Sequence, residues 1–206
     1  MSGEVVVLLA TRSEGKLREL RPLFEAAGIQ VHDLREARVL PSPGEEDVEA
    51  FDTFEANALA KARYFHALTG RPTVADDSGL EVVALQGSPG VRSKRWSGRD
   101  DLAGQALDDA NNARLLESLR HVERPVARYV CAAAYYDGAR EDVVRGETSG
   151  TIVRDPRGVE GFGYDPFFLS DELGATFGES SRAQKELVSH RGRAFRALMA
   201  QLSVPR

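Results

Sequence analysis

The chain has 206 residues, of which 42% are hydrophobic and 29% charged, and this is enough for a single globular domain, residues 1–206, built as one body or two joined lobes. Its net charge of −5 argues against a nucleic-acid binder, because such affinity comes mainly from a basic surface. No window approaches the ~20 apolar residues of a membrane span, which argues against a membrane partner. The lone Cys131, without a targeting peptide, predicts a cytoplasmic protein.

The first part of the chain alternates between strand and helix patterns. Residues 4–10 form a continuous apolar run, which predicts a buried central strand. From Lys16 onward, apolar residues recur at helical spacing up to Gly28, and Pro22 predicts either a kink or a late start for this helix. Residues 29–34 predict a second short strand.

An acidic loop and a second helix come next. Residues 35–52 contain proline and lack a sustained period, so they predict a loop of the length that is often functional. Asp52 and Thr53 are the candidate N-caps of a helix that ends at Gly70.

The remaining chain predicts a brief strand over 73–77 that ends in a tight turn over 76–79. Asp137-Gly138 predicts a hairpin between two extended segments. The other expected elements are an extended segment at 80–85, a helix at 102–119, strands at 126–136 and 140–146, a glycine-rich loop at 155–166 and a closing helix at 183–202. This order predicts a mixed α/β or α+β sheet rather than a purely doubly wound one.

The segment after the first predicted strand is a candidate anion site. It leads directly into a helix, where backbone N–H groups and the helix dipole favour negative charge. Lys16 adds a charge, and Thr11 and Ser13 add hydroxyl groups. The alternative is a capped helix start with a solvated lysine, because the spacing matches neither a Walker A loop nor a dinucleotide fingerprint.

Two adjacent carboxylates, Asp76 and Asp77, form the second candidate site. Both can be buried only if a cation or hydrogen-bond donors compensate them, and neighbouring side chains of a strand point to opposite faces. Magnesium takes one or two protein carboxylates and fills the rest with water and phosphate, so one acid of the 44–52 loop would complete a site. The candidates are Glu45, Glu46, Asp47 and Glu49. The alternative is an acidic turn without metal.

Several further residues could contact a substrate. Lys61 lies one helical turn after Asn57 on the same face. The segment Gly161-Phe162-Gly163-Tyr164-Asp165-Pro166 interleaves glycines with aromatic rings that could stack on a base, or it is a buried turn. Lys185, His190 and Arg191 gather donors near the last predicted helix, or are surface residues.

The ordered set of motifs resembles the inosine triphosphate pyrophosphatase family, also described as non-canonical purine NTP or dITP/XTP pyrophosphatases. The resemblance covers nearly the whole chain. It rests on Ala10-Thr11 with Gly15-Lys16, Thr53-Phe54 with Asn57-Ala58 and Lys61-Ala62, the run from Ala75 to Val82, Gly87 to Gly98, Gly161 to Pro166, Thr176 with Glu179, Lys185 and Ser189-His190-Arg191.

The resemblance implies a two-lobed α/β fold around a long mixed sheet with a deep central cleft, usually as a homodimer. It implies hydrolysis of ITP, dITP or XTP to the monophosphate and pyrophosphate with Mg²⁺. In the same way, Asp77 is the expected general base, Lys16 shares the catalytic work, and Glu49 and Asp77 are the expected metal ligands. The expected substrate contacts are Thr11, Arg12, Ser13, Glu14, Gly15, Lys16, Lys61, Ser78, Arg95, Phe162, Gly163, Tyr164, Asp165, Lys185, His190 and Arg191.

The chain departs from the family pattern at two places. Arg12 and Ser13 stand where Gly and Asn are common, and Ala50-Phe51 replaces a Thr-Gly pair after the expected metal glutamate. Two alternatives to the implied activity are a Maf-type pyrophosphatase with another base preference, and a catalytically silent nucleotide-binding regulator.

Overall fold

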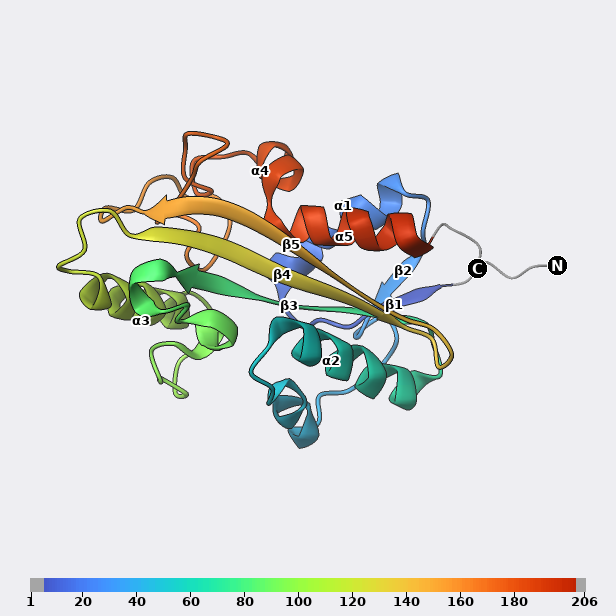
Figure 1. The fold of residues 1–206 in the computed structure, drawn as a ribbon. Helices are drawn as coiled ribbons and strands as arrows, with labels where there is room; N and C mark the ends of the chain where they lie inside the picture. The colour runs from blue at the N-terminus through green and yellow to red at the C-terminus, as the bar shows by residue number, and fades with distance from the viewer. Residues whose placement is uncertain (1–5, 203–206) are drawn as a thin grey trace. The chain divides into compact units, whose positions relative to one another are not determined.

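The computed structural model describes residues 6–202, which form a mixed α/β fold around one six-stranded sheet (Figure 1). The strands are β1 (Val7–Leu9), β2 (Val31–Asp33), β3 (Thr73–Val82), β4 (Val126–Tyr136), β5 (Glu141–Ile152) and β6 (Phe168–Ser170). The helices are α1 (Glu14–Ala26), α2 (Phe54–Thr69), α3 (Gly104–Ser118), α4 (Arg182–Val188) and α5 (His190–Leu202). The strand order is β2-β1-β3-β4-β5-β6, with β1 parallel to β2 and β3 and with β5 antiparallel to β6. The predicted mixed sheet is therefore confirmed.

The chain divides into two compact units. Unit 1 contains the described residues up to Asp77, Cys131–Gly146, and those from Arg191 onward. Unit 2 contains Ser78–Val130 and Glu147–His190.

Within the described part of the chain, no helix is both long and apolar enough to cross a membrane.

In unit 1, helices lie on both faces of the strands. The aromatic rings of Phe24 in α1 and Phe195 in α5 meet edge to face with their centroids 5.7 Å apart, so these two helices share one face. Helix α2 lies on the other side of the strands (Figure 1). It buries Phe54, Ala58, Ala62 and Phe65.

The helix ends of unit 1 follow local capping signals. Thr53 caps α2 by accepting a hydrogen bond from the Ala56 amide, and Gly70 ends the helix in the left-handed conformation, as predicted. Helix α1 begins at Glu14, so the late start inferred from Pro22 is wrong, and the proline is tolerated inside the helix. The strand predicted over residues 4–10 is observed as β1, while residues 4 and 5 lie outside the described range.

Four further sequence predictions need correction. The extended segment expected at residues 80–85 ends at Val82, and a 3-10 helix, Val83–Leu85, follows it. The tight turn at residues 76–79 does not exist, because β3 runs without interruption through both aspartates. The closing helix is two helices, since Ser189 between them has an extended backbone conformation. The loop at residues 35–52 contains a 3-10 helix, Pro43–Glu49, which starts with a proline and a capping box.

The core of unit 2 is rich in aromatic rings. Tyr129 of β4 packs against Phe168 of β6 at a centroid distance of 4.6 Å, and Phe177 lies 5.1 Å from Phe168. Leu115 of α3 joins this core. Because β6 pairs with β5 beside these rings, the backbone of Gly150 lies directly against them.

We expect Gly150→Ala to destabilise the protein by about 1–3 kcal/mol, the usual range for overpacking a core. An added Cβ would lie 2.3 Å from the Leu169 carbonyl oxygen and 2.7 Å from the Phe168 ring, and neither can move freely. Urea unfolding measures the change. Gly44→Ala is the matched control, because its Cβ would meet nothing closer than 3.8 Å. Equal midpoints for both variants would contradict the prediction.

Candidate functional site

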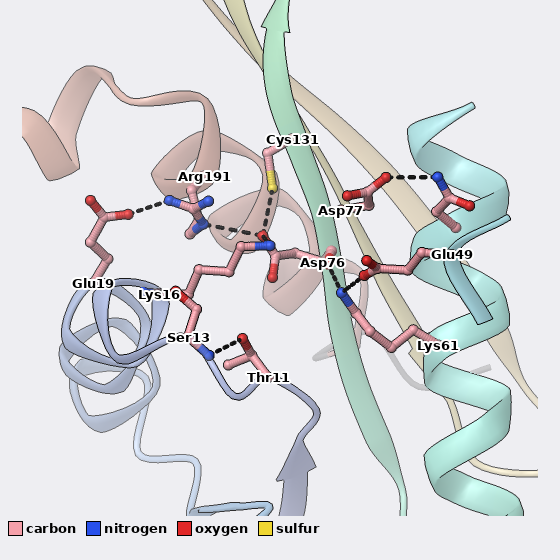
Figure 2. Close-up of polar contacts among 11 residues, drawn as sticks. Thr11, Ser13, Lys16, Glu19, Glu49, Lys61, Asp76, Asp77, Cys131 and Arg191 are labelled. Carbon is pink, nitrogen blue, oxygen red and sulfur yellow. Dashed lines mark hydrogen bonds and ion pairs between the residues drawn. The ribbon is translucent and has the colours of Figure 1, made fainter. Parts of the chain in front are cut away.

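The loop between β1 and α1 is organised by its own hydroxyl groups. The Ser13 side chain accepts a hydrogen bond from the Lys16 amide at 3.4 Å, and the Ser13 amide donates to Thr11 Oγ1 at 3.2 Å (Figure 2). Glu14 and Gly15 complete the first helical turn. The loop therefore presents a capped helix N-terminus, with Lys16 reaching out from its first turn.

The guanidinium of Arg12 pairs with Glu45 of the acidic loop. Its guanidinium makes two 2.6 Å contacts with Glu45 and also donates to the Val39 carbonyl. The hydrogen bond from Arg12 holds the pKa of Glu45 below its usual value. Arg12 and Glu45 thus engage each other, whereas Glu49 lies elsewhere. The side chain of Glu46 is outside the described part of the chain.

The carboxylate of Asp76 is only 1% exposed and collects charged partners. Lys16 Nζ lies 3.0 Å and Arg191 Nε 3.2 Å from its Oδ2 (Figure 2). The thiol of Cys131 lies 3.9 Å from the same oxygen. Burial opposes ionisation, but Lys16 and Arg191 outweigh it and lower the pKa of Asp76. Asp76 is therefore a permanently charged structural anion.

Asp77 lies on the opposite face of β3 and is 7% exposed. Its Oδ2 accepts a 2.9 Å hydrogen bond from Asn57 Nδ2 on α2. Burial raises the pKa of Asp77, and the nearby charge of Glu49 adds to the rise, while Lys16 and Lys61 oppose it. A carboxylate with a raised pKa binds a proton more readily, which is the property of a general base.

Lys61 connects Glu49 to the aspartate strand. The Lys61 ammonium forms an ion pair with Glu49 and donates to the backbone carbonyl of Asp76. Burial disfavours its charge, but Glu49 and both aspartates outweigh this and raise the pKa of Lys61. Lys61 lies four residues after Asn57, so the predicted shared helix face brings both to the same strand.

Two residues of this cluster were missed or underrated by sequence reasoning. Glu19 of α1 was not a candidate, yet its carboxylate forms an ion pair with Arg191 of α5. Asn57 was noted for its helix face and as part of a family motif but not as a site residue, yet it contacts Asp77 and holds both the amide and the carbonyl of Phe51. Spacing could have found them, because Glu19 follows Lys16 by three residues and Asn57 precedes Lys61 by four.

Unit 2 contains a second polar cluster, centred on Asp165. This carboxylate is 2% exposed and accepts from Lys185 Nζ at 2.6 Å and from the Phe162 amide at 2.8 Å. The Lys185 ammonium also lies 5.2 Å from the ring centroids of Phe162 and Phe177. The expected base-binding loop is thus held through Asp165 and Lys185 to the aromatic core.

The other residues of unit 2 that were expected to contact substrate differ in how deeply they are buried. The Tyr164 hydroxyl donates to the Ser93 carbonyl at 2.7 Å, so this ring packs inward. His190 stacks on Tyr129 with a centroid distance of 4.6 Å. Ser78 is half-buried in β3, and Arg95 is exposed at the end of a 3-10 helix, Gly90–Arg95.

The expected residues are divided between the two units. The set in unit 1 comprises Thr11, Ser13, Glu14, Gly15, Lys16, Glu49, Lys61, Asp77 and Arg191, with Arg12 turned toward Glu45. The set in unit 2 comprises Ser78, Arg95, Phe162, Gly163, Tyr164, Asp165, Lys185 and His190. Arg191 belongs to unit 1, where it pairs with Glu19 and Asp76.

Comparison with known proteins identifies the family of the chain. Residues 7–201 match the model of the Ham1 family. The chain is 50% identical over 199 residues to a dITP/XTP pyrophosphatase of Frankia alni, covering 95% of this chain and 96% of the relative. It is 48% identical over 201 residues to a dITP/XTP pyrophosphatase of Mycobacterium tuberculosis, covering 95% and 94%.

Solved structures show the same likeness. A HAM1 protein from Coxiella burnetii superimposes with a TM-score of 0.82 at 32% identity, covering 97% of this chain and 98% of that one. A nucleoside-triphosphatase / dITP/XTP pyrophosphatase from Mycobacterium abscessus has a TM-score of 0.71 at 39% identity, covering 96% and 100%. The resemblance inferred from the motifs is confirmed, and the chain belongs to the Ham1 family.

Proposed function

We propose that this protein hydrolyses non-canonical purine nucleoside triphosphates, namely ITP, dITP and XTP, to the monophosphate and pyrophosphate. The observation that carries this proposal is Asp77, a buried carboxylate held by Asn57 and adjacent in the strand to Asp76, which contacts both Lys16 and Lys61. Relatives that match nearly the whole chain are named dITP/XTP pyrophosphatases, and this supports the substrate class.

In the proposed reaction, Asp77 takes a proton from a water molecule whose oxygen attacks phosphorus in line with the departing pyrophosphate. The Asn57 amide holds the carboxylate in place through its 2.9 Å bond. Lys16 and Lys61 offset negative charge on the phosphates, and the capped start of α1 offers backbone N–H groups. Here the protein contributes position and charge, because phosphoryl transfer needs little covalent chemistry.

The charges of unit 1 fit a divalent cation. Lys16, Lys61 and Arg191 face four carboxylates, those of Glu19, Glu49, Asp76 and Asp77, so the cluster has no positive excess for a polyphosphate. Glu49 and Asp77 lie close enough for one charge to raise the pKa of the other. The described residues contain no group of three His, Cys, Asp or Glu suited to a metal, but magnesium needs only one or two protein carboxylates.

We therefore propose that Glu49 and Asp77 hold Mg²⁺, which would neutralise phosphate charge when bound.

We also propose that the protein is a cytoplasmic homodimer that binds neither nucleic acid nor membrane. The acidic net charge of −5 supports the exclusion of nucleic acid.

We propose that the polar cluster of unit 2, formed by Asp165, Lys185 and Phe162, selects the base. Hypoxanthine and xanthine carry a 6-oxo group, so the site must aim a hydrogen-bond donor at it; a donor left facing an amino group is unpaired, and this discriminates by about 10⁴. Lys185 is held in a fixed direction by Asp165, and Phe162 offers a ring for stacking. Together they suit recognition of a flat, oxo-substituted ring.

Pyrophosphate release from ITP, XTP, dITP, GTP, ATP and UTP, with and without magnesium, tests the function directly. We expect turnover of ITP, dITP and XTP only, and only with the metal. Preference for UTP or for canonical nucleotides would indicate the Maf-type activity. Tight binding without release would indicate a silent regulator.

We expect Asp77→Asn to lower kcat/KM by about 10²–10⁴ while the fold persists, because the asparagine oxygen can still accept from Asn57. In the wild type, the rate should fall as the pH drops and Asp77 becomes protonated, since only the ionised carboxylate can accept a proton or hold Mg²⁺. Kinetics across pH and a melting curve measure both effects. Asp47→Asn, at an exposed acid of the 3-10 segment, is the control. Unchanged rates for Asp77→Asn would remove this residue from the mechanism.

Glu49→Gln should raise the magnesium concentration needed for half-maximal rate far more than Glu45→Gln does. The reason is that Glu49 lies beside Asp77, whereas Glu45 is engaged by Arg12. Magnesium titration of the initial rate measures the difference, with Glu46→Gln as a further comparison. Similar shifts in all three variants would refute the choice of Glu49.

A further inference from the structure

Helix α3 holds the backbone of Gly163 from both sides. The Asp108 carboxylate accepts the Gly163 N–H at 3.0 Å, and Asn112 Nδ2 donates to the Gly163 carbonyl at 3.0 Å. Asp108 and Asn112 are four residues apart, so they share one face of the helix. All three residues belong to unit 2. One acceptor and one donor therefore fix the orientation of a single loop residue.

The backbone conformation of Gly163 determines how the two flanking aromatic residues, Phe162 and Tyr164, are oriented. It has a φ of +63°, the left-handed region, in a segment without regular secondary structure. On one side Tyr164 is buried and bonded to Ser93, and on the other the half-buried Phe162 lies under Lys185. Turning the Gly163 backbone would rotate the Phe162 ring relative to Asp165.

The two clamping side chains occupy unfavourable places, which indicates that their contact with Gly163 matters. Burial raises the pKa of Asp108, and the charges of Asp109 and Asp165 act in the same direction, while the Gly163 N–H opposes them. Asn112 is 6% exposed, and its Oδ1 is buried without a hydrogen-bond partner among the described residues. An apolar residue would avoid both costs, so a simple packing role does not explain this pair.

We propose that Asp108 and Asn112 are positioning residues that set the base specificity of the enzyme by holding Gly163, and through it Phe162, in one orientation. The inference rests on the proposed function, because the ring of Phe162 matters only if a base stacks there. The clamp acts on recognition of the base, whereas proton transfer belongs to Asp77 in unit 1. Its loss should therefore raise KM and weaken discrimination while kcat changes little.

Hydrogen exchange of the free protein tests the clamp without catalysis. Asp108→Ala and Asn112→Ala should both speed amide exchange in a peptide covering residues 160–168. Asp108→Asn should stay near the wild type, because its amide oxygen can still accept from Gly163. Asp109→Ala is the matched control, since this exposed neighbour accepts a hydrogen bond from Gln105 on the same helix. Unchanged exchange in both alanine variants overturns the proposal.

Steady-state kinetics test the consequence for specificity. The ratio of kcat/KM for ITP to that for ATP should fall about tenfold in Asp108→Ala and in Asn112→Ala, and little further in the double variant, because both act on one residue. Asp108→Asn should restore the ratio. Faster exchange with an unchanged ratio overturns the specificity role. If the wild type releases no pyrophosphate from any nucleotide, the proposed function fails, whereas the exchange measurement still decides whether the clamp exists.

Discussion

The buried carboxylate of Asp76 is the constraint on which the arrangement of unit 1 depends. An ionised carboxylate at 1% exposure costs several kcal/mol unless cations and donors compensate it. Two cations do so: Lys16 comes from the first turn of α1, and Arg191 from the first turn of α5. The starts of two helices are thereby tied to the central strand. Because Lys16 follows the capped loop directly, the same ion pair fixes where that loop and its backbone N–H groups lie.

This compensation leaves Asp77 available for a different role. Alternation along β3 turns its side chain to the opposite face, toward Asn57 of α2. Neighbouring carboxylates on one strand therefore have pKa values shifted in opposite directions: that of Asp76 downward by ion pairing and that of Asp77 upward by burial. Pairs of acids whose environments separate their pKa values are a recurrent basis for dividing structural and proton-accepting roles.

Local signals predicted the parts of the fold that local interactions determine. The Thr53 cap, the Gly70 stop and the hairpin at Asp137 were all found, because each depends on residues within one turn. The predicted turn at Asp76 was wrong because β3 is held extended by pairing with β1 and β4, which are distant in sequence and leave no local signal in residues 76–79. The break at Ser189 was missed because apolar residues on both sides, among them Leu187 and Leu198, were assigned to one helix, although residues 189–193 between them are not apolar.

The two polar clusters meet different physical demands, and this explains their different composition. In the charged cluster of unit 1, four carboxylates face three cationic side chains, which is why the proposed polyphosphate site includes a divalent cation. In unit 2 the charges of Lys185 and Asp165 balance within a buried pair, and rings surround them. A balanced, buried pair adds little net attraction for a ligand, but its donors are fixed in direction. Under the proposed function, the charged cluster of unit 1 and its divalent cation would determine how strongly the phosphates bind, whereas the proposed clamp on Gly163 would determine which base is chosen.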